Sequence, residues 1–446
     1  MAAGLAAAAV AALVACTSRA EEGGTIRETS PAATPGAPPP DPADWPGWTA
    51  VHADSRNTDF AAVTGPDDVE LAWELHLEGD VRIGDLDWTI NLGPTSDAAG
   101  RLYVTANVPG CRLQALDLAT GERRWCAPQV GPGGVLSSPL IDADGNLYLA
   151  DGEAMRSFRP DGTERWAQPI VGVPLSAQLS PAGDVLLITH IGVVHLLDRA
   201  TGAPELEPVA LAPGLSWQPG EPLWACARGT DGCPSANTPA VDPQTGRIYF
   251  TWWEPGAPQA GVRAVQLVED GRARLEDLWT TTDLPGGSGA SPVLSADGTR
   301  LYVTDNVSSA HALDAATGEV IWSHDIGIAA GGSLSVSPDG VILPPGGALQ
   351  AFRDDGERAT PLWREDALQN RGIATQAAGD RAYATVVRAP GALDLVVVDT
   401  RTGAVLDREP ISGTTRFSVG ITIAADGTIL VPTITGTLAA FRPARG

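Results

Sequence analysis

Cysteine is the residue type in this chain best able to form covalent bonds, and its five copies fall into two groups. Cys16 stands alone near the start, whereas Cys111, Cys126, Cys226 and Cys233 lie in the turn-rich remainder. An even number suits disulfide formation in an oxidising compartment, and the short spacings favour the pairs Cys111–Cys126 and Cys226–Cys233. Four cysteines allow three pairings, however, and buried free thiols are the alternative.

The histidines and acidic residues show no spacing typical of a metal site. The histidines are His52, His76, His190, His195, His311 and His324, and we expect solvated or structural roles for them. The stretch DADGN (142–146) is similar to a calcium loop, but its glycine comes one position too early and no glutamate follows at the required distance. Neither a Gly-x-Ser-x-Gly elbow nor a phosphate-binding Gly-Lys-Ser/Thr loop is present. We therefore predict no catalytic and no metal-binding residue.

The first sixteen residues, MAAGLAAAAVAALVAC, form a short apolar run with small residues before Cys16. The run is too short to span a bilayer and has the length of the apolar core of a signal peptide. It resembles a bacterial lipobox, which implies lipidation of Cys16 and a place in the cell envelope, at the periplasmic face of the outer membrane or at the cell surface. No Lys or Arg precedes the run, so an ordinary cleaved signal or a non-exported alanine-rich tail is the alternative.

Composition indicates a tether and excludes one class of partner. Residues 17–44 are rich in Pro, Ala and Glu and lack apolar periodicity, which is typical of a disordered tether. The whole chain has 54 acidic residues against 29 basic ones, all of them arginine, and a formal net charge of −25. Because this charge repels a polyanion, we do not expect nucleic acid as a partner.

A repeated strand unit must position the residues named so far. Eight strand-like phrases each follow a turn: GRLYVT from Gly100, GNLYLA from Gly145, GDVLLIT from Gly183, GRIYFT from Gly246, TRLYVT from Thr299, GVILPP from Gly340, DRAYATV from Asp380 and GTILVPT from Gly427. Each phrase is preceded by another β-type run and followed by an apolar strand, a turn and a fourth short strand. Four-stranded units at this kind of spacing are typical of β-propeller blades, which bury their faces against neighbouring blades.

One eleven-residue phrase marks the third and fourth strands of the unit. ALDLATGERRW (115–125) returns as ALDAATGEVIW (312–322). It predicts a strand, a tight turn in which glycine tolerates positive φ, and a strand ending in a tryptophan that covers the joint between two blades. The tryptophans expected in this structural role are Trp73, Trp125, Trp166, Trp279, Trp322 and Trp363.

The two ends of the repeat region complement each other. The last unit (420–446) supplies three strands, whereas VELAWELHLEG (69–79) is a lone strand that precedes the first unit. We predict that these segments combine and close the ring. The expected fold class is all-β, an eight-bladed β-propeller of four-stranded antiparallel blades over residues 45–446, with an insertion at about residues 211–234.

The phrases at 115–125 and 312–322, together with the entry segment WPGWTAVHADSRNTDF (45–60), resemble the PQQ-like propeller superfamily of the quinoprotein dehydrogenases. In those enzymes pyrroloquinoline quinone lies over a Ca²⁺ ion, between a tryptophan and a disulfide of adjacent cysteines. This chain has no Cys-Cys pair, and its repeats are short. The non-catalytic branch, such as the lipoprotein of the outer-membrane barrel-assembly machinery, uses an eight-bladed ring as a docking platform.

A lipobox, a tether and a bare ring match the non-catalytic branch more closely. We therefore expect a lipid-anchored, monomeric propeller that binds other envelope proteins and needs no cofactor. The alternative is a quinoprotein-type dehydrogenase that binds pyrroloquinoline quinone and calcium. The third and seventh units, with DRATGAPEL and DTRTGAVLD, depart from the motif because they lack its tryptophan.

The repeat also predicts which face carries a binding site. The turns between strands one and two and between strands three and four are short and uniform, and they share one face. The opposite face carries loops of variable length, where recognition usually resides. The residues expected near a partner are Trp217, Trp224, Trp252, Trp253 and the loop from Cys226 to Cys233. The alternative is that these aromatic side chains cap a small core within the insertion itself.

Overall fold

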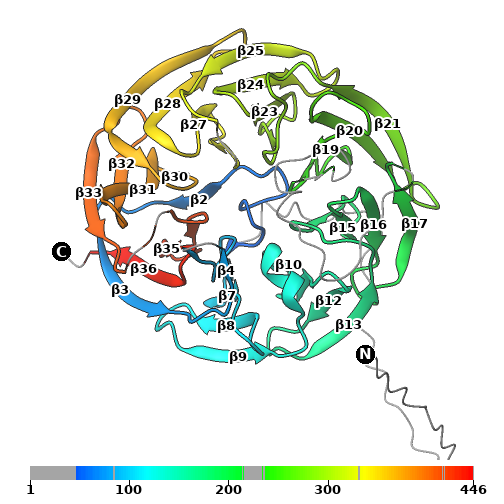
Figure 1. Ribbon diagram of the computed structural model, residues 1–446, viewed down its shortest axis with the longest axis horizontal. Coiled ribbons are helices and arrows are strands. Elements are labelled where there is room, and N and C mark those ends of the chain that lie inside the picture. The colour runs from blue at the N-terminus through cyan, green and yellow to red at the C-terminus, as the bar shows by residue number, and fades with distance from the viewer. Residues whose placement is uncertain are drawn as a thin grey trace, which may run out of the picture. The chain divides into compact units, whose positions relative to one another are not determined.

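The computed structural model describes residues 47–83, 86–212, 214, 234, 237–329, 332–413, 415 and 417–444. They belong to one compact unit, Pro39–Gly446, and form a ring of strands with one short 3-10 helix, η2 (Pro132–Leu136) (Figure 1). Within these ranges no helix is long and apolar enough to cross a membrane. Some residues with a sequence-based expectation lie outside the described ranges, namely Cys16, the tether, Trp217, Trp224, Cys226 and Cys233.

The first four blades follow one another around the ring, each an antiparallel four-stranded unit. Blade 1 contains β6 (Thr95–Asp97), β7 (Arg101–Thr105), β8 (Leu113–Asp117) and β9 (Arg123–Ala127). Blade 2 contains β10 (Leu140–Ile141), β11 (Leu147–Ala150), β12 (Ala154–Phe158) and β13 (Glu164–Pro169). Blade 3 contains β14 (Gln178–Leu179), β15 (Val185–Ile188), β16 (Val193–Leu197) and β17 (Pro204–Ala210). Blade 4 contains β18 (Ala240–Val241), β19 (Arg247–Trp252), β20 (Gly261–Val268) and β21 (Arg274–Thr281).

The remaining blades repeat this order until the last one (Figure 1). Blade 5 contains β22 (Val293–Leu294), β23 (Arg300–Thr304), β24 (Ser309–Asp314) and β25 (Val320–Asp325). Blade 6 contains β26 (Ser335–Val336), β27 (Val341–Leu343), β28 (Gly347–Asp354) and β29 (Ala359–Asn370). Blade 7 contains β30 (Thr375–Ala378), β31 (Arg381–Ala389), β32 (Ala392–Asp399) and β33 (Val405–Pro410). Blade 8 contains β34 (Thr422–Ile423), β35 (Ile429–Pro432), β36 (Thr437–Pro443) and, from the other end of the chain, β3 (Val69–His76). A small hairpin, β4 (Arg82–Ile83) with β5 (Leu86–Asp87), links β3 to blade 1.

Ring closure occurs in blade 8, where the two ends of the repeat region meet. Strand β3 pairs antiparallel with β36, from Val69 opposite Pro443 to His76 opposite Thr437. Figure 1 shows the blue strand β3 running along the outer edge of the red strand β36. The prediction of eight four-stranded blades, the last one closed by an N-terminal strand, is confirmed.

Burial within a blade falls from the channel outward. In blade 1, β7 is buried at every position after Arg101, whereas β9 begins with two exposed arginines. The middle strands are covered on both faces by neighbouring blades, so they read as continuous apolar runs rather than alternating ones. The clusters of buried side chains accordingly combine two blades, as where Tyr302 and Ala312 of blade 5 pack with Ile342 and Phe352 of blade 6.

Six tryptophans on outer strands join successive blades, as the repeated phrase indicates. Each indole N–H donates a hydrogen bond to the following blade. The bonds run from Trp73 to Leu118 O (2.9 Å), from Trp125 to Pro160 O (3.0 Å), from Trp166 to Arg199 O (3.1 Å), from Trp279 to Ala315 O (3.2 Å), from Trp322 to Asp354 Oδ1 (3.0 Å) and from Trp363 to Thr400 O (2.7 Å).

The glycine of the phrase packs against the tryptophan of the preceding blade rather than that of its own blade. Gly121 adopts φ +73°, and a Cβ there would lie 2.7 Å from Cε3 of Trp73 in blade 8. Gly202 likewise has φ +77° and would place a Cβ 2.5 Å from Cε3 of Trp166 in blade 2. Only glycine combines this backbone conformation with so close an approach of an indole. Gly and Trp of one phrase therefore take part in two different blade interfaces.

Blade 3 has no outer-strand tryptophan, and a different residue fills its joint with blade 4. Trp252, at the end of β19, is 1% exposed and packs with Leu196 of blade 3 and Phe250 of blade 4. A Cβ on Gly192 would lie 2.0 Å from Cη2 of Trp252, so the blade 3 hairpin lies directly on the indole. Trp252 thus supplies the aromatic packing that the outer strand of blade 3 lacks.

The segment that precedes β3, residues 47–65, crosses the centre of the ring, and we call it the lead-in. It begins with β1 (Gly47–Trp48), which pairs with β6 of blade 1, and ends with β2 (Phe60–Thr64), which lies parallel to β30 of blade 7 (Figure 1). Between them, lead-in carbonyls accept hydrogen bonds from the innermost strands of other blades. The donors are the amides of Ile141, Val241, Leu294, Val336 and Gln376, and the acceptors are the carbonyls of Thr49, Ser55, Arg56, Thr58 and Asp59, at 2.7–3.0 Å.

The lead-in provides hydrogen-bond partners for the inner edge of the propeller. Innermost strands would otherwise present unpaired amides to the channel, and buried unpaired amides are costly. Blade 3 is reached through a side chain, because Gln178 Nε2 donates to Asn57 Oδ1 at 3.0 Å. Trp48, 1% exposed, packs with Ile421 and Phe441 of blade 8. One short segment therefore contacts all eight blades.

Candidate functional site

A cavity of about 850 Å³ lies at the centre of the ring, on the face of the variable loops. It is lined by crossings between blades, such as those before β6, β18 and β30, and by loops between second and third strands, such as that from Pro345 to Gly347. Apolar side chains including Trp88, Ile373 and Phe417 line it beside polar ones. Trp88 and Phe417 meet edge to face, with ring centroids 6.4 Å apart. We call this cavity the funnel.

The lead-in lies beneath the funnel. His52 is the lead-in residue that lines the funnel, whereas Asp54, Arg56 and Thr58 line a second cavity of about 240 Å³. That second cavity borders the uniform turns, including Pro338 of blade 6. The lead-in therefore separates the two ends of the channel, and the funnel has a floor.

Hydroxyl side chains surround the floor at one level of the channel. Five consecutive blades place a hydroxyl residue two positions before their first strand, namely Ser138, Ser176, Thr238, Ser291 and Ser333. All five are buried. Most of them bond to backbone, as in the 2.8 Å bond that Ser138 Oγ donates to Gly93 O. Ser291 differs from them because its partner is a histidine.

His52 connects Ser291 to a buried carboxylate. His52 Nδ1 lies 2.9 Å from Asp59 Oδ2, and His52 Nε2 lies 3.2 Å from Ser291 Oγ. Burial raises the pKa of Asp59, and the neighbouring His52 partly offsets that rise. His52 and Ser291 both line the funnel. From the sequence we expected only a solvated or structural role for His52 and did not single out Ser291, because His52 and Ser291 are 239 positions apart.

A second chain of the same type occurs away from the funnel. In blade 5, His311 Nε2 lies 2.9 Å from Asp305 Oδ2, and His311 Nδ1 lies 2.8 Å from Ser323 Oγ. Although burial raises the pKa of Asp305, hydrogen bonds from backbone amides and from His311 bring it below its ordinary value. None of these three residues lines the funnel. This cluster joins β24 to β25.

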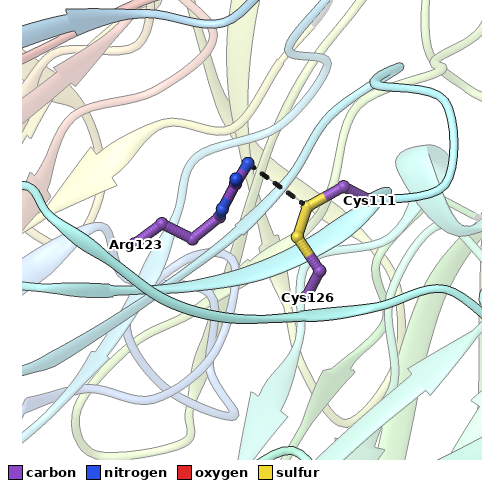
Figure 2. The surroundings of a disulfide bond; sticks show 3 residues. All are labelled: Cys111, Arg123 and Cys126. Carbon is purple, nitrogen blue, oxygen red and sulfur yellow. Dashed lines mark hydrogen bonds between the residues drawn. A yellow bond between two sulfur atoms is a disulfide. The ribbon is translucent and has the colours of Figure 1, made fainter.

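The disulfide Cys111–Cys126 joins the loop before β8 to β9, with the two Cα atoms 5.1 Å apart. Figure 2 shows the Arg123 side chain directed towards Cys111, with Nη1 3.9 Å from Sγ. The bridge closes a loop of blade 1, and neither cysteine lines the funnel.

Two of the tryptophans expected near a partner are described, and they differ in exposure. Trp252 is buried between blades 3 and 4, so its indole is not available to a partner. Trp253 is half-buried, and its Nε1 donates to Ala257 O at 3.0 Å. Neither side chain lines the funnel.

Two histidines of blade 3 make folding sensitive to pH. Burial lowers the pKa of His190 and of His195 from 6.5 to about 4. His190 Nδ1 accepts a hydrogen bond from Val173 N at 3.0 Å, as a neutral imidazole can. Below pH 6.5 the unfolded chain binds protons at these two histidines, whereas the folded chain does not. The free energy of unfolding therefore has its full value above pH 6.5 and decreases as the pH falls towards 4. Each site can account for about 3 kcal/mol, at 1.36 kcal/mol per pKa unit.

We expect His195→Gln to reduce the loss of unfolding free energy between pH 7 and pH 5, as measured by urea denaturation. Burial and the nearby Glu269, Glu205 and Asp198 raise the pKa of Asp184 to about 6. Asp184 therefore increases the free energy of unfolding as the pH falls, opposite to the effect of the histidines. The comparison is therefore between variant and parent at each pH. His76→Gln, at an exposed position of β3, is the control, and an unchanged pH profile in His195→Gln would contradict the expectation.

Comparisons with known proteins agree with this architecture. The family model described as "Outer membrane protein assembly factor BamB" matches residues 46–252 and 270–446. "Protein Rv3035" of Mycobacterium tuberculosis (strain ATCC 25618 / H37Rv) is 32% identical over 413 residues, which cover 89% of this chain and 96% of that protein. The outer membrane protein assembly factor BamB of Xanthomonas campestris pv. campestris (strain ATCC 33913 / DSM 3586 / NCPPB 528 / LMG 568 / P 25) is 28% identical over 406 residues, covering 78% and 80%.

A solved structure shows the same fold at low identity. The quinohemoprotein alcohol dehydrogenase of Comamonas testosteroni superposes with a TM-score of 0.60 and 14% identity, covering 90% of this chain and 82% of that one. This likeness concerns the ring, whereas the family match covers most of the sequence. The chain therefore belongs to the BamB-type family of PQQ-like eight-bladed propellers.

Proposed function

We propose that this protein is a lipid-anchored component of the bacterial cell envelope whose propeller is a binding platform for partner proteins. The observation that carries the proposal is the funnel, a floored cavity on the face of the variable loops. Such a site on a rigid scaffold suits recognition. Membership of the BamB-type family supports an envelope role, and the lipobox-like start of the sequence supports a lipid anchor at Cys16.

Exposed apolar side chains on this face support the same proposal. Val171 and Val307 are 52% and 54% exposed, the largest values among the large apolar residues described. Val171 lies in the crossing between β13 and β14, and Val307 lies in the loop between β23 and β24. Both positions belong to the face on which the funnel opens. Exposed apolar side chains on the face that carries a cavity are available for contact with a protein surface.

The likeness to a quinohemoprotein alcohol dehydrogenase raises a second function, the oxidation of a substrate by bound pyrroloquinoline quinone and calcium. The described residues do not fit this pair. Among them, no group of three His, Cys, Asp or Glu side chains is placed to hold a metal ion, and no carboxylate lines the funnel. The described disulfide joins cysteines 15 positions apart rather than adjacent ones. We therefore propose a platform that needs neither group.

Site-specific photocrosslinking tests the platform. We expect a photoreactive residue at Val307 to capture a partner in intact cells, because this side chain lies on the funnel face. The same residue at Ala143, exposed in the turn between β10 and β11 on the opposite face, is the control. Equal capture at both positions, or capture at Ala143 alone, would contradict the proposal. Stoichiometric uptake of pyrroloquinoline quinone with dye-linked alcohol oxidation would favour the dehydrogenase instead.

A further inference from the structure

The residues Asp59, His52 and Ser291 form a continuous hydrogen-bonded chain whose last member borders the funnel. The distances are 2.9 Å between Asp59 Oδ2 and His52 Nδ1 and 3.2 Å between His52 Nε2 and Ser291 Oγ. A carboxylate on Nδ1 selects the imidazole tautomer whose Nε2 accepts a proton. Nε2 is therefore placed to receive the hydroxyl proton of Ser291. This is the relation between base, orienting carboxylate and nucleophile that activates a serine.

We propose that Ser291 is an activated nucleophile that accepts acyl groups from carboxylic esters entering the funnel, a reactivity beyond the platform function.

The lead-in holds this arrangement in a demanding backbone conformation. Asp59 has φ +46°, and Asn57 and Ala53 have φ +62° and +73°, all in the left-handed region that side chains other than glycine rarely adopt. Asn57 Nδ2 donates to Thr238 O and to Pro292 O, each at 3.0 Å. The bond to Pro292 O attaches the lead-in to the residue after Ser291. A residue other than glycine keeps a positive φ only where the surrounding structure imposes it, and such residues are frequent at functional sites.

The Asp59–His52–Ser291 cluster differs from the similar cluster of blade 5 in its access to the funnel. His52 and Ser291 line a cavity of about 850 Å³, whereas Asp305, His311 and Ser323 do not line it. Asn237 also lines the funnel, and its Nδ2 donates to Gly289 O at 2.8 Å, two residues before Ser291. A side-chain amide carries two N–H groups, and donors of this kind stabilise an oxygen that develops negative charge.

The chemistry balances with water as the other reactant. Ser291 Oγ bonds to the carbonyl carbon of the ester while its proton moves to His52 Nε2. The bond from that carbon to the alcohol oxygen then breaks, and the leaving alkoxide takes the proton from Nε2. A water molecule attacks the acyl-Ser291 ester by the same route, releasing the carboxylic acid and restoring the Ser291 hydroxyl. Asp59 is a positioning residue, because it acts through His52.

A fluorophosphonate probe measures the nucleophile directly, because Oγ forms a bond to phosphorus as fluoride leaves. We expect the full-length protein to be labelled at Ser291, as located by peptide mass spectrometry, and Ser291→Ala to lose the label. Ser138→Ala, at the equivalent position of blade 2, and Ser323→Ala, in the blade 5 cluster, are controls that should label at the parent rate. Labelling that persists in Ser291→Ala, or no labelling of the parent, would overturn the proposal.

The role of the base has a separate readout. His52→Ala should be labelled at least about 100-fold more slowly, because 100-fold is the usual lower bound for the contribution of a general base. Added imidazole, entering from the funnel, should restore part of the labelling rate. Near-ultraviolet circular dichroism reports whether the variant keeps its fold. A folded His52→Ala that labels at the parent rate would contradict the proposal. Capture at Val307 should be unchanged in Ser291→Ala, so this inference and the platform can fail independently.

Discussion

A chain that begins at residue 80 is expected to lose its cooperative unfolding transition. This truncation removes the lead-in and β3, so β36 becomes an unpaired edge and the indole of Trp73 no longer covers the joint with blade 1. The innermost strands also lose the carbonyls that accept from Ile141, Val241 and their counterparts. A propeller blade buries its faces only against neighbours, so opening the ring at one joint exposes two blades.

Two further truncations separate the contributions of the lead-in and of β3. A chain that begins at residue 66 keeps β3 but lacks the lead-in, and we expect it to unfold cooperatively at a lower temperature. A chain that begins at residue 45 keeps both and is the control. Differential scanning calorimetry compares the three. If the chain from residue 80 keeps the transition of the control, the closure of blade 8 by β3 does not stabilise the ring.

Replacing Trp252 should cost far more stability than replacing its neighbour Trp253. Trp252→Ala is expected to lower the free energy of unfolding by about 3–5 kcal/mol, because it empties the joint between blades 3 and 4. Trp252 Nε1 also donates to Glu254 Oε2 at 2.8 Å, and that bond is lost. Trp253→Ala should cost about 1 kcal/mol, because this side chain is half-buried and bonds within its own loop.

Urea denaturation of the two variants, followed by circular dichroism, provides the measurement. The variants remove the same side chain at adjacent positions, so differences in composition do not enter. Comparable losses in both would show that Trp252 is not the packing residue of this interface. Trp253→Ala also tests the expectation that Trp253 lies near a partner, because capture at Val307 should fall in this variant if the partner contacts Trp253.

Local pattern was sufficient to predict the strands and the closure. The phrases that begin at Gly100 and Gly145 combine β-branched and aromatic residues with a turn glycine, and those preferences act over a few residues. The surplus strand at 69–79 and the three-stranded unit at 420–446 are visible in the repeat itself. The expected place of three docking tryptophans follows for the same reason, since Trp125, Trp166 and Trp322 each lie four residues after a turn glycine.

The pairing across blades could not be obtained in this way. The phrase places Gly121 four residues before Trp125, but Gly121 contacts Trp73 and Trp125 docks on the next blade. Likewise, Trp252 was expected in a variable loop after the phrase GRIYFT, although it ends β19 and packs inside the ring. Which neighbour a side chain meets depends on how the blades stack, and that relation is absent from any single unit.

Sequence by itself determined the number of blades, the split blade and the uniform and variable faces, because strands and turns respond to neighbours in the chain. The path of the lead-in was decided by the tertiary structure alone. Its hydrogen bonds use backbone carbonyls, which every residue has, so no side-chain pattern records them. The funnel floor has the same origin, since His52 reaches Asp59 across 7 positions and Ser291 across 239. Only the tertiary fold brings Ser291 within hydrogen-bond distance of His52.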